Sequence, residues 1–493
     1  MAKDLVDVVK KSITADVVVE GPIAVTETSH PFSAMAYARE PLDIATYGYI
    51  EEEYFISGTA NVYEEVKDEL KVKYTDQAYK NRILVRKPSD ARKFSGRVFM
   101  DIYNASNGYD IEDVWRRSYD YYMNNGDIYI GVTAKPINVL SLKNFDFERY
   151  HTLNWSAAEP APQPSAVNSN MSIPGTEEGL AWDILNQLAT LVRRNNGPFL
   201  ADYPVDYLYL TGQSQSGMYL NTYTYYFDQY LVDNEGKPVF DGYLNAVGAG
   251  VMRALDQVEG ENQPFATRLQ KNRPLNVPMI FLSAHGDIEL FGAFETNTEA
   301  LVEEKPEDHT RHYEVASSPH TDPASTLIPS NSEIVKTNHP PKILDGEYDY
   351  TVNDIQLSYY INSALEMLHQ WAAKGTLPPA SLLIERDEAG NAILDEHGNG
   401  VGGVRSPYVD VPLATYFANA RATADQVNQV VGNVNGSMEY FSKDKLSELY
   451  PSEEHYLALF NEAVDQQVED KLLLPFDAKS MKEWAKETIY KIY

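Results

Sequence analysis

The sequence predicts an α/β fold with a mostly parallel sheet flanked by helices. Short apolar stretches rich in Val, Ile and Tyr alternate along the chain with amphipathic stretches of helical periodicity. Strands that alternate with helices form βαβ units, in which neighbouring strands run parallel. The sequence contains no repeat of fixed period, so we expect neither a solenoid nor a propeller.

The predicted strands share a short run of β-branched or aromatic residues bounded by Gly, Pro or polar clusters. Those near the middle of the chain are mostly apolar or aromatic, which is typical of parallel strands covered on both faces. The strands are expected at residues 16–20, 47–57, 97–103, 128–134, 205–211, 242–247, 277–283 and 312–316. The acidic run Glu51-Glu52-Glu53 is interpreted as a solvated strand edge that discourages pairing with other chains.

The predicted helices begin and end at recognisable signals. The first ends at Gly126, and the second begins at Thr176 and ends before Gly197-Pro198. The third ends at Gly375, and more helix is expected towards the C-terminus. Their ranges are residues 111–125, 176–195 and 354–374.

We expect three parts along the chain. Residues 1–95 form an N-terminal β-containing segment, and residues 96–375 form the α/β core. Residues 376–493 form a C-terminal mixed extension that packs on the core. Within the core, residues 136–175 contain several prolines and are expected to be a long, lid-like loop.

Composition excludes several classes of protein. The chain has 493 residues, with 41 Lys and Arg against 72 Asp and Glu, and a net charge of −31. Such a chain repels phosphate groups, so we expect no nucleic-acid partner. The absence of cysteine excludes disulfides and thiolate metal sites, and the sequence predicts neither a metal nor a cofactor.

The distribution of charge along the chain also bears on location. No stretch reaches about eighteen apolar residues, and charges interrupt the first twenty or so positions. We therefore expect no membrane partner, no signal peptide and a cytoplasmic protein, although a secreted protein trimmed of its signal peptide would look the same. The oligomeric state is not predicted from the sequence.

The strongest chemical signal lies in residues 205–219, where a hydrophobic strand leads into Gly-Gln-Ser-Gln-Ser-Gly and then into a possible helix. A nucleophile elbow requires small residues two positions before and two positions after the nucleophile. Ser214 meets this requirement with Gly212 and Ser216, whereas Ser216 as the nucleophile would place the large Met218 at a small position. We predict that Ser214 is the nucleophile; a Gly-Ser-rich turn without chemistry is the alternative.

A serine nucleophile needs a histidine base and an acid that orients the histidine. In an elbow site both partners follow the serine in the chain. Asp287 follows the strand at residues 277–283 and is the predicted acid, with Glu289 as the second candidate. His320 lies in the loop after the strand at residues 312–316, which suits a mobile base.

The remaining candidates surround this predicted triad. The backbone N–H of Gln215 and that of Asn104 or Ala105, in the loop after the strand at residues 97–103, are expected to form the oxyanion hole. His285 and Tyr103 stand at strand ends and are expected to contact the substrate.

Two motifs resemble a known family. Residues 212–217 give G-Q-S-Q-S-G, and residues 314–322 give E-V-A-S-S-P-H-T-D. They are similar to the G-x-S-Q-S-G elbow and the late E-V-A-G-x-x-H-x-D motif of an alpha/beta-hydrolase domain family, with Ser317 where the family often has Gly. Further similarity lies in residues 52–63, 179–184, 402–407 and 410–412.

The resemblance covers most of the chain and implies an alpha/beta-hydrolase fold. It also implies a serine hydrolase with Ser214 and His320 in the site, acting on small-molecule esters through an acyl-enzyme. The family often has an acidic residue at the position of His285, which leaves Asp287 as the acid here.

Other functions remain open. The 35 tyrosines and the acidic composition are also compatible with a catalytically inactive protein of the same fold that binds carbohydrate or a surface. A triad does not distinguish leaving groups, so an amidase or an acyltransferase is a further alternative. Calcium binding by Asp387, Asn391, Asp395 and Asn399 is a hypothesis, and hairpin turns explain the same residues.

Overall fold

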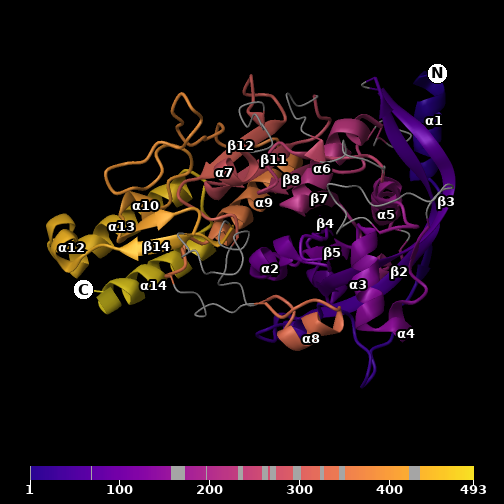
Figure 1. Cartoon of the computed structure of the whole chain (residues 1–493), viewed down its shortest axis with the longest axis horizontal. Coiled ribbons are helices and arrows are strands. Elements are labelled where there is room, and N and C mark those ends of the chain that lie inside the picture. The colour runs from indigo at the N-terminus through magenta and orange to yellow at the C-terminus, as the bar shows by residue number, and fades with distance from the viewer. Residues whose placement is uncertain are drawn as a thin grey trace. The chain divides into compact units, whose positions relative to one another are not determined.

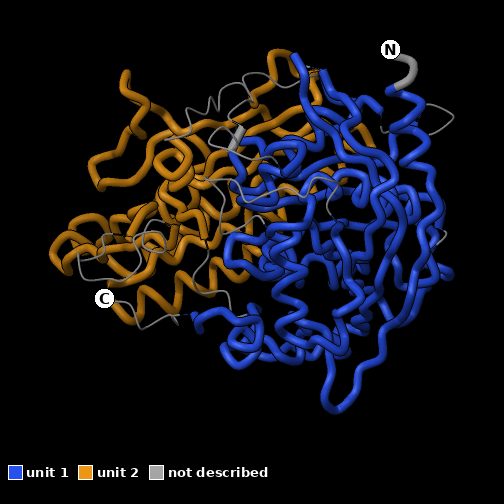
Figure 2. The backbone as a smooth tube through the Cα atoms, turned by 45° about the vertical axis from the view of Figure 1, so that its right-hand side comes forward, with its two compact units in different colours: residues 1–278, 326–342 blue, residues 279–325, 343–493 orange. Residues whose placement is uncertain are grey.

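The computed structural model forms two compact units, coloured differently in Figure 2. Unit 1 comprises residues 1–278 and 326–342, and unit 2 comprises residues 279–325 and 343–493. The expected divisions at residues 95 and 375 fall inside these units and remain a prediction. The structure describes residues 2–67, 69–156, 173–195, 197–230, 232, 237–257, 265–266, 274–292, 301–321, 327–342, 350–420 and 434–492.

Unit 1 is built on a sheet that is antiparallel on one side and parallel on the other. Its strands are β1 Val18–Glu20, β2 Tyr49–Val66, β3 Glu69–Pro88, β4 Arg97–Ile102, β5 Ile128–Val132, β6 Asn154–Trp155, β7 Tyr207–Gln213 and β8 Gly242–Ala246. Their order is β1-β2-β3-β5-β4-β7-β8, with β6 beside β3. The pairs β5-β4, β4-β7 and β7-β8 are parallel, as predicted for the apolar strands.

The parallel strands end at one edge of the sheet. Ile102, the last residue of β4, pairs with Val132 at the end of β5 and with Gly212 near the end of β7. The segments that follow these strands therefore leave the sheet side by side. Ligand sites of α/β sheets lie at this carboxyl edge, and Ser214 is one of the residues found there.

The helices of unit 1 broadly follow the predicted pattern. They are α1 Ala2–Ile13, α2 Asp113–Asn125, α3 Pro136–Phe145, α4 Phe147–Tyr150, α5 Ala181–Arg193, α6 Gln215–Phe227 and α8 Asn331–Lys336. Helix α2 ends at Gly126, whose φ of 76° is the left-handed conformation that favours glycine. Helix α5 begins five residues after the predicted Thr176, because Glu177 accepts the Gly179 N–H and caps a 3₁₀ turn first.

The segment at residues 136–175 differs from the predicted long loop. Its first part contains α3 and α4, and only residues 157–172 lie outside the described residues. Prolines indicate a loop in general, but Pro136 occupies the first turn of α3, where its missing N–H removes no helical hydrogen bond. The lid function of this segment remains a prediction.

The acidic run in β2 is not a solvated edge. Strands β2 and β3 form a long antiparallel hairpin at the right of Figure 1. Glu53 is 1% exposed, and its carboxylate accepts hydrogen bonds from Arg82 at 2.5 Å and Arg149 at 2.6 Å. The interpretation was wrong because these cationic partners lie far away in the sequence, where strand periodicity does not reveal them.

Unit 2 has two strand pairs and a helical C-terminal part. Its elements are β11 Met279–Ala284, α7 Gly286–Gly292, β12 Thr310–Val315, α9 Leu357–Lys374, α10 Pro407–Asp410, β13 Ala414–Phe417, β14 Ser437–Tyr440, α12 Lys443–Leu449, α13 Glu453–Glu469 and α14 Pro475–Ile492. Strands β11 and β12 are parallel, and β13 and β14 are antiparallel. Helix α9 ends at Gly375 as predicted, in the left-handed conformation.

The C-terminal elements of unit 2 enclose their own apolar core. Residues of α10, β13, β14, α12, α13 and α14 contribute to it, and Tyr408, Tyr456 and Phe460 are among its most buried members. None of the helices that the structure describes is both long enough and apolar enough to span a membrane.

Candidate active site

Ser214 occupies a strained turn between β7 and α6. Its φ of 53° and ψ of −120° lie outside the regions that residues with a side chain normally adopt. Its N–H donates to the Ala246 carbonyl at 2.8 Å, and its carbonyl accepts the Met218 N–H at 3.1 Å. Backbone strain of this kind collects at functional sites, and the nucleophile elbow that the sequence predicts requires such a turn between a strand and a helix.

Glycines make this turn sterically possible. A Cβ on Gly212 would lie 2.4 Å from the Ser216 carbonyl oxygen, so that only glycine fits two residues before Ser214. A Cβ on Gly217 would lie 2.8 Å from the Cα of Gly248. In a nucleophile elbow the second glycine usually stands two positions after the serine and allows a close approach of the backbone. Here Ser216 has that position, and the close approach is made at Gly217.

Ser216 is not available as a nucleophile. Its side chain is 0% exposed, and its Oγ accepts a hydrogen bond from Lys135 Nζ at 3.0 Å. Ser214, in contrast, is partly exposed. The structure thus leaves Ser214 more accessible than Ser216, and the choice of Ser214 as the nucleophile stays a prediction.

The predicted oxyanion loop is only partly suitable. The Asn104 N–H donates to the Ile111 carbonyl at 3.1 Å, so Asn104 was wrongly predicted as a backbone donor. A β-bridge between residues 104 and 111 uses that N–H, and a loop sequence does not reveal such pairing. The Ala105 N–H donates to Gln215 Oε1 at 3.0 Å, which places it beside the first residue of α6.

Asp287 and His320 form a buried pair in unit 2. His320 Nδ1 lies 2.5 Å from Asp287 Oδ1, and both residues are 4% exposed. The other carboxylate oxygen accepts the Ala284 N–H at 2.8 Å, so the acid is fixed at the end of β11. A carboxylate on Nδ1 holds the proton there and leaves Nε2 as the basic nitrogen of the neutral imidazole.

Glu289, the second candidate acid, lies elsewhere. It is exposed, and its Oε2 accepts a hydrogen bond from Asn419 Nδ2 at 2.6 Å. The structure brings Asp287 to His320, and Ser214 belongs to the other compact unit. Each unit thus carries one half of the predicted catalytic apparatus.

His285 holds the backbone of the loop that leads to His320. Its Nδ1 accepts the Ser317 N–H at 3.0 Å, and Ser317 has a φ of 59°. Ser317 Oγ accepts the Gly400 N–H at 2.9 Å, and its carbonyl accepts a hydrogen bond from Asn353. These contacts fix a serine in the left-handed conformation that glycine adopts more easily, and they give His285 a structural role in place of the predicted substrate contact.

Burial lowers the pKa of His285 to about 4; the nearby Glu314 raises this pKa, and Arg386 lowers it further. The folded protein therefore binds fewer protons than the unfolded chain between pH 4 and 6.5, and stability rises with pH across this range. We expect the free energy of unfolding to fall by about 2 kcal/mol from pH 7 to pH 5 through His285 alone. Urea unfolding of the parent and of His285→Asn at both pH values measures this difference.

The exposed His455 on α13 offers a matched control in the same unit. His455→Asn should keep the pH dependence of the parent, whereas His285→Asn should lose about 2 kcal/mol of it. Equal slopes in the parent and in His285→Asn would contradict the role of a buried, neutral His285.

Tyr103 does not contact substrate. Its ring is 0% exposed, and its hydroxyl donates to Glu112 at 3.0 Å. The tyrosine oxygen occupies the space that a Cβ on Gly131 would need, which shows that the ring packs across β5. The prediction was wrong because a residue that follows a strand can point into the core as well as into a cleft.

The residues considered for calcium form two matching turns. Asp387 Oδ1 accepts the N–H groups of Ala389 and Asn391, and Asp395 Oδ1 accepts those of His397 and Asn399. Arg405 also pairs with Asp395 at 3.0 Å. Among the described residues no group of three His, Cys, Asp or Glu side chains could hold a metal ion, so hairpin turns explain this segment.

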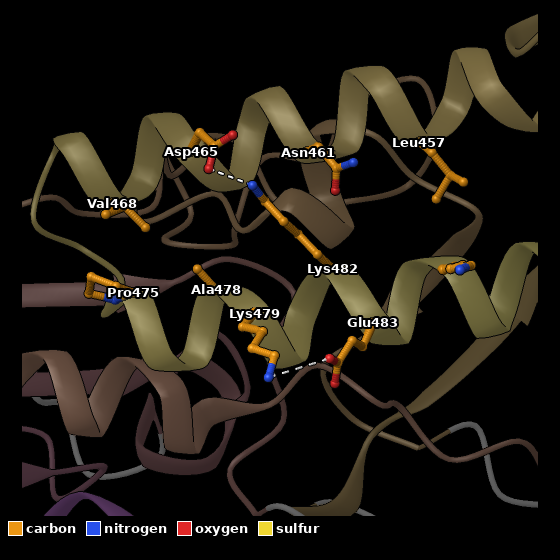
Figure 3. Close-up of a pocket in the computed structure, with 10 residues that line it drawn as sticks. Leu457, Asn461, Asp465, Val468, Pro475, Ala478, Lys479, Lys482 and Glu483 are labelled. Carbon is orange, nitrogen blue, oxygen red and sulfur yellow. Dashed lines mark hydrogen bonds and ion pairs between the residues drawn. The ribbon is translucent and has the colours of Figure 1, made fainter.

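A cavity of about 510 Å³ lies between α13 and α14. Figure 3 shows ion pairs across and along it, Lys482 with Asp465 and Lys479 with Glu483. None of the predicted site residues is part of its lining, so it is separate from the candidate active site.

A family model described as an alpha/beta hydrolase domain matches residues 19–483. The chain therefore belongs to the alpha/beta hydrolase domain family, which confirms the fold class expected from its two motifs. No curated protein sequence matches the chain.

Several solved structures are similar at low identity. A putative dienelactone hydrolase from Klebsiella pneumoniae matches with 11% identity and a TM-score of 0.27, over 57% of this chain and 95% of that one. A bacterial heroin esterase matches with 10% identity and a TM-score of 0.26, over 50% and 68% of the two chains. The match to EstA from Aspergillus niger has 11% identity and a TM-score of 0.19, over 34% of this chain and 26% of that one. The assignment to the family rests on the family match, not on these structures.

Lys135 is the residue near Ser214 that the sequence analysis missed. Its ammonium is buried and contacts both the loop after β4 and the first turn of α6. The one available signal was a lone lysine after an apolar strand and before Pro136. Because proline favours an extended preceding residue, this lysine continues past the end of β5.

Proposed function

We propose that the protein is a serine hydrolase that cleaves carboxylic esters of small molecules. The conformation of Ser214 at the turn between β7 and α6 is the observation that carries this proposal. The pair of His320 and Asp287 supports it, because a buried carboxylate that orients an imidazole is the usual companion of a serine nucleophile. Membership of a hydrolase family supports the class of reaction.

In the proposed mechanism Ser214 Oγ attacks the ester carbonyl carbon while His320 Nε2 takes the hydroxyl proton. Asp287 stabilises the resulting imidazolium through Nδ1. The N–H groups of Gln215 and Ala105 are the proposed donors to the oxyanion, with the Gln215 side chain moving off the Ala105 N–H to free it. The intermediate expels the alcohol, which leaves with the proton from His320.

The second half of the reaction releases the acid. Water attacks the acyl-enzyme, His320 takes one of its protons, and collapse of the second tetrahedral intermediate returns that proton to Ser214 Oγ. The products are one carboxylic acid and one alcohol. An ester is preferred over an amide by analogy with the family that the two motifs resemble, because the triad itself does not distinguish leaving groups.

A small fluorophosphonate tests the proposal directly. It forms a stable covalent adduct only with an activated serine, so we expect one adduct per chain by intact mass. Fragmentation of the labelled peptide should place the adduct on Ser214, and acetyl and butyryl esters of 4-nitrophenol should protect it during turnover. A chain that stays unlabelled would reject the proposal and favour the inactive binding protein on the same fold.

A further inference from the structure

Lys135 connects two segments that flank the nucleophile. Its Nζ donates to the carbonyl oxygen of Tyr103 at 2.5 Å and to Ser216 Oγ at 3.0 Å. Tyr103 directly precedes the loop that contains Ala105, and Ser216 lies two residues after Ser214. One side chain from the segment between β5 and α3 therefore holds the loop after β4 against the first turn of α6.

Two further hydrogen bonds join the same segments. Asn104 Nδ2 donates to the Gln213 carbonyl at 3.1 Å, and the Ala105 N–H donates to Gln215 Oε1 at 3.0 Å. Both are made by neutral amide groups of the loop or the turn. The hydrogen bonds of Lys135 differ from these two, because their donor is a charged group and belongs to a third segment, the one between β5 and α3.

The burial of this ammonium is unfavourable. Lys135 is 1% exposed, and no carboxylate among the described residues lies within ion-pair distance of it. Tyr219 of α6 offers its ring face 4.4 Å from Nζ. Burial lowers the pKa of Lys135 to about 7; Arg253 lowers it further, whereas Asp110, Glu178 and Asp101 raise it.

A residue that served only stability would not be expected here. Burying a charge without a close counter-charge costs free energy, so stability alone would not favour a lysine at this position. The geometry points instead to a role in the reaction, because both partners of Nζ lie within two residues of the proposed nucleophile or of a proposed oxyanion donor.

We propose that Lys135 is a positioning residue, which holds the loop carrying Ala105 at the correct distance from Ser214 and Gln215. The proposal rests on the proposed serine hydrolase function. Lys135 itself touches no reacting atom. It acts through the Tyr103 carbonyl and the Ser216 hydroxyl, which fix the separation of the two oxyanion donors.

Lys135→Met tests this role, because methionine keeps much of the length and loses both hydrogen bonds and the charge. We expect kcat for 4-nitrophenyl acetate to fall about 100-fold with KM changed less than about twofold, since a misplacement near 1 Å is enough for such a loss. The urea midpoint at pH 7 should stay level or rise, and the gain should shrink towards pH 10, where the unfolded lysine also begins to lose its proton.

Two variants complete the test. Lys135→Arg keeps the charge and donors and should recover part of the lost kcat. Lys143→Met changes a partly exposed lysine on helix α3, which directly follows Lys135, and should leave kcat and KM unchanged. A Lys135→Met protein that keeps its kcat, or that loses stability together with activity or fails to fold, would overturn the proposal.

Amide hydrogen exchange separates this proposal from the proposed function. In folded Lys135→Met, the amides of Ala105 and Ser106 should exchange at least about tenfold faster than in the parent, whether or not an ester is turned over. Unchanged exchange would overturn the positioning role. If the parent hydrolyses no ester while exchange still increases, the proposed function fails but the link between the two segments holds.

Discussion

Ser214→Ala is expected to lower kcat for ester hydrolysis by about 10⁶-fold, to a residual rate that the remaining oxyanion donors and substrate binding sustain. The hydroxyl is the proposed bond-forming atom, so no other described group can take its place in the acyl-enzyme route. Alanine must adopt the same positive φ as serine at this position, so it should fit the turn equally well. Steady-state turnover of 4-nitrophenyl acetate, with circular dichroism of both proteins, measures the loss.

Ser216→Ala is the matched control for this prediction. It removes a hydroxyl two residues away whose side chain is fully buried and bonded to Lys135. The variant should still form one fluorophosphonate adduct, with kcat reduced far less than in Ser214→Ala. If Ser216→Ala were inert and Ser214→Ala remained active, the assignment of the nucleophile would be wrong.

Much of the candidate site could be predicted from local sequence. A strand, a glycine at the position before the turn and a helix after it define the environment of Ser214 within a few residues. His320 and Asp287 could be predicted because each follows a short apolar strand. Such local features can be predicted from the sequence because the residues that form the motif also form the turn.

What could not be predicted depends on distant partners. Within the acidic run of β2, Glu53 is buried because Arg82 and Arg149 neutralise its carboxylate. Lys135 connects two segments that lie far from it in the sequence. The hydrophobic periodicity of the sequence indicates neither the ion pairs of Glu53 nor the hydrogen bonds of Lys135. The Asn104 N–H was misassigned for a related reason, because the bridge that uses it forms inside an irregular loop.

Asp287→Asn is expected to lower kcat by about 10⁴-fold while the protein stays folded. The oxygen of a neutral amide can accept a hydrogen bond from His320 Nδ1, but it lacks the negative charge with which a carboxylate stabilises the imidazolium. The amide can also present its own N–H to Nδ1 and so favour the wrong tautomer, in which Nε2 carries the proton and cannot act as a base. The Ala284 N–H still has an amide oxygen to bond, so the end of β11 should keep its structure.

Glu289→Gln provides the matched control, because it makes the same chemical change to an exposed carboxylate two residues away. Its kcat should remain within about twofold of the parent, since Glu289 bonds Asn419 and not His320. Each variant removes one negative charge, so a difference between their kcat values reports the specific contact of Asp287 with His320 and not the change in net charge. Loss of activity in Asp287→Asn that returns at high pH, where hydroxide can replace the general base, would identify the defect as one of proton transfer. Equal activity of both variants would remove Asp287 from the mechanism and leave His320 without its acid.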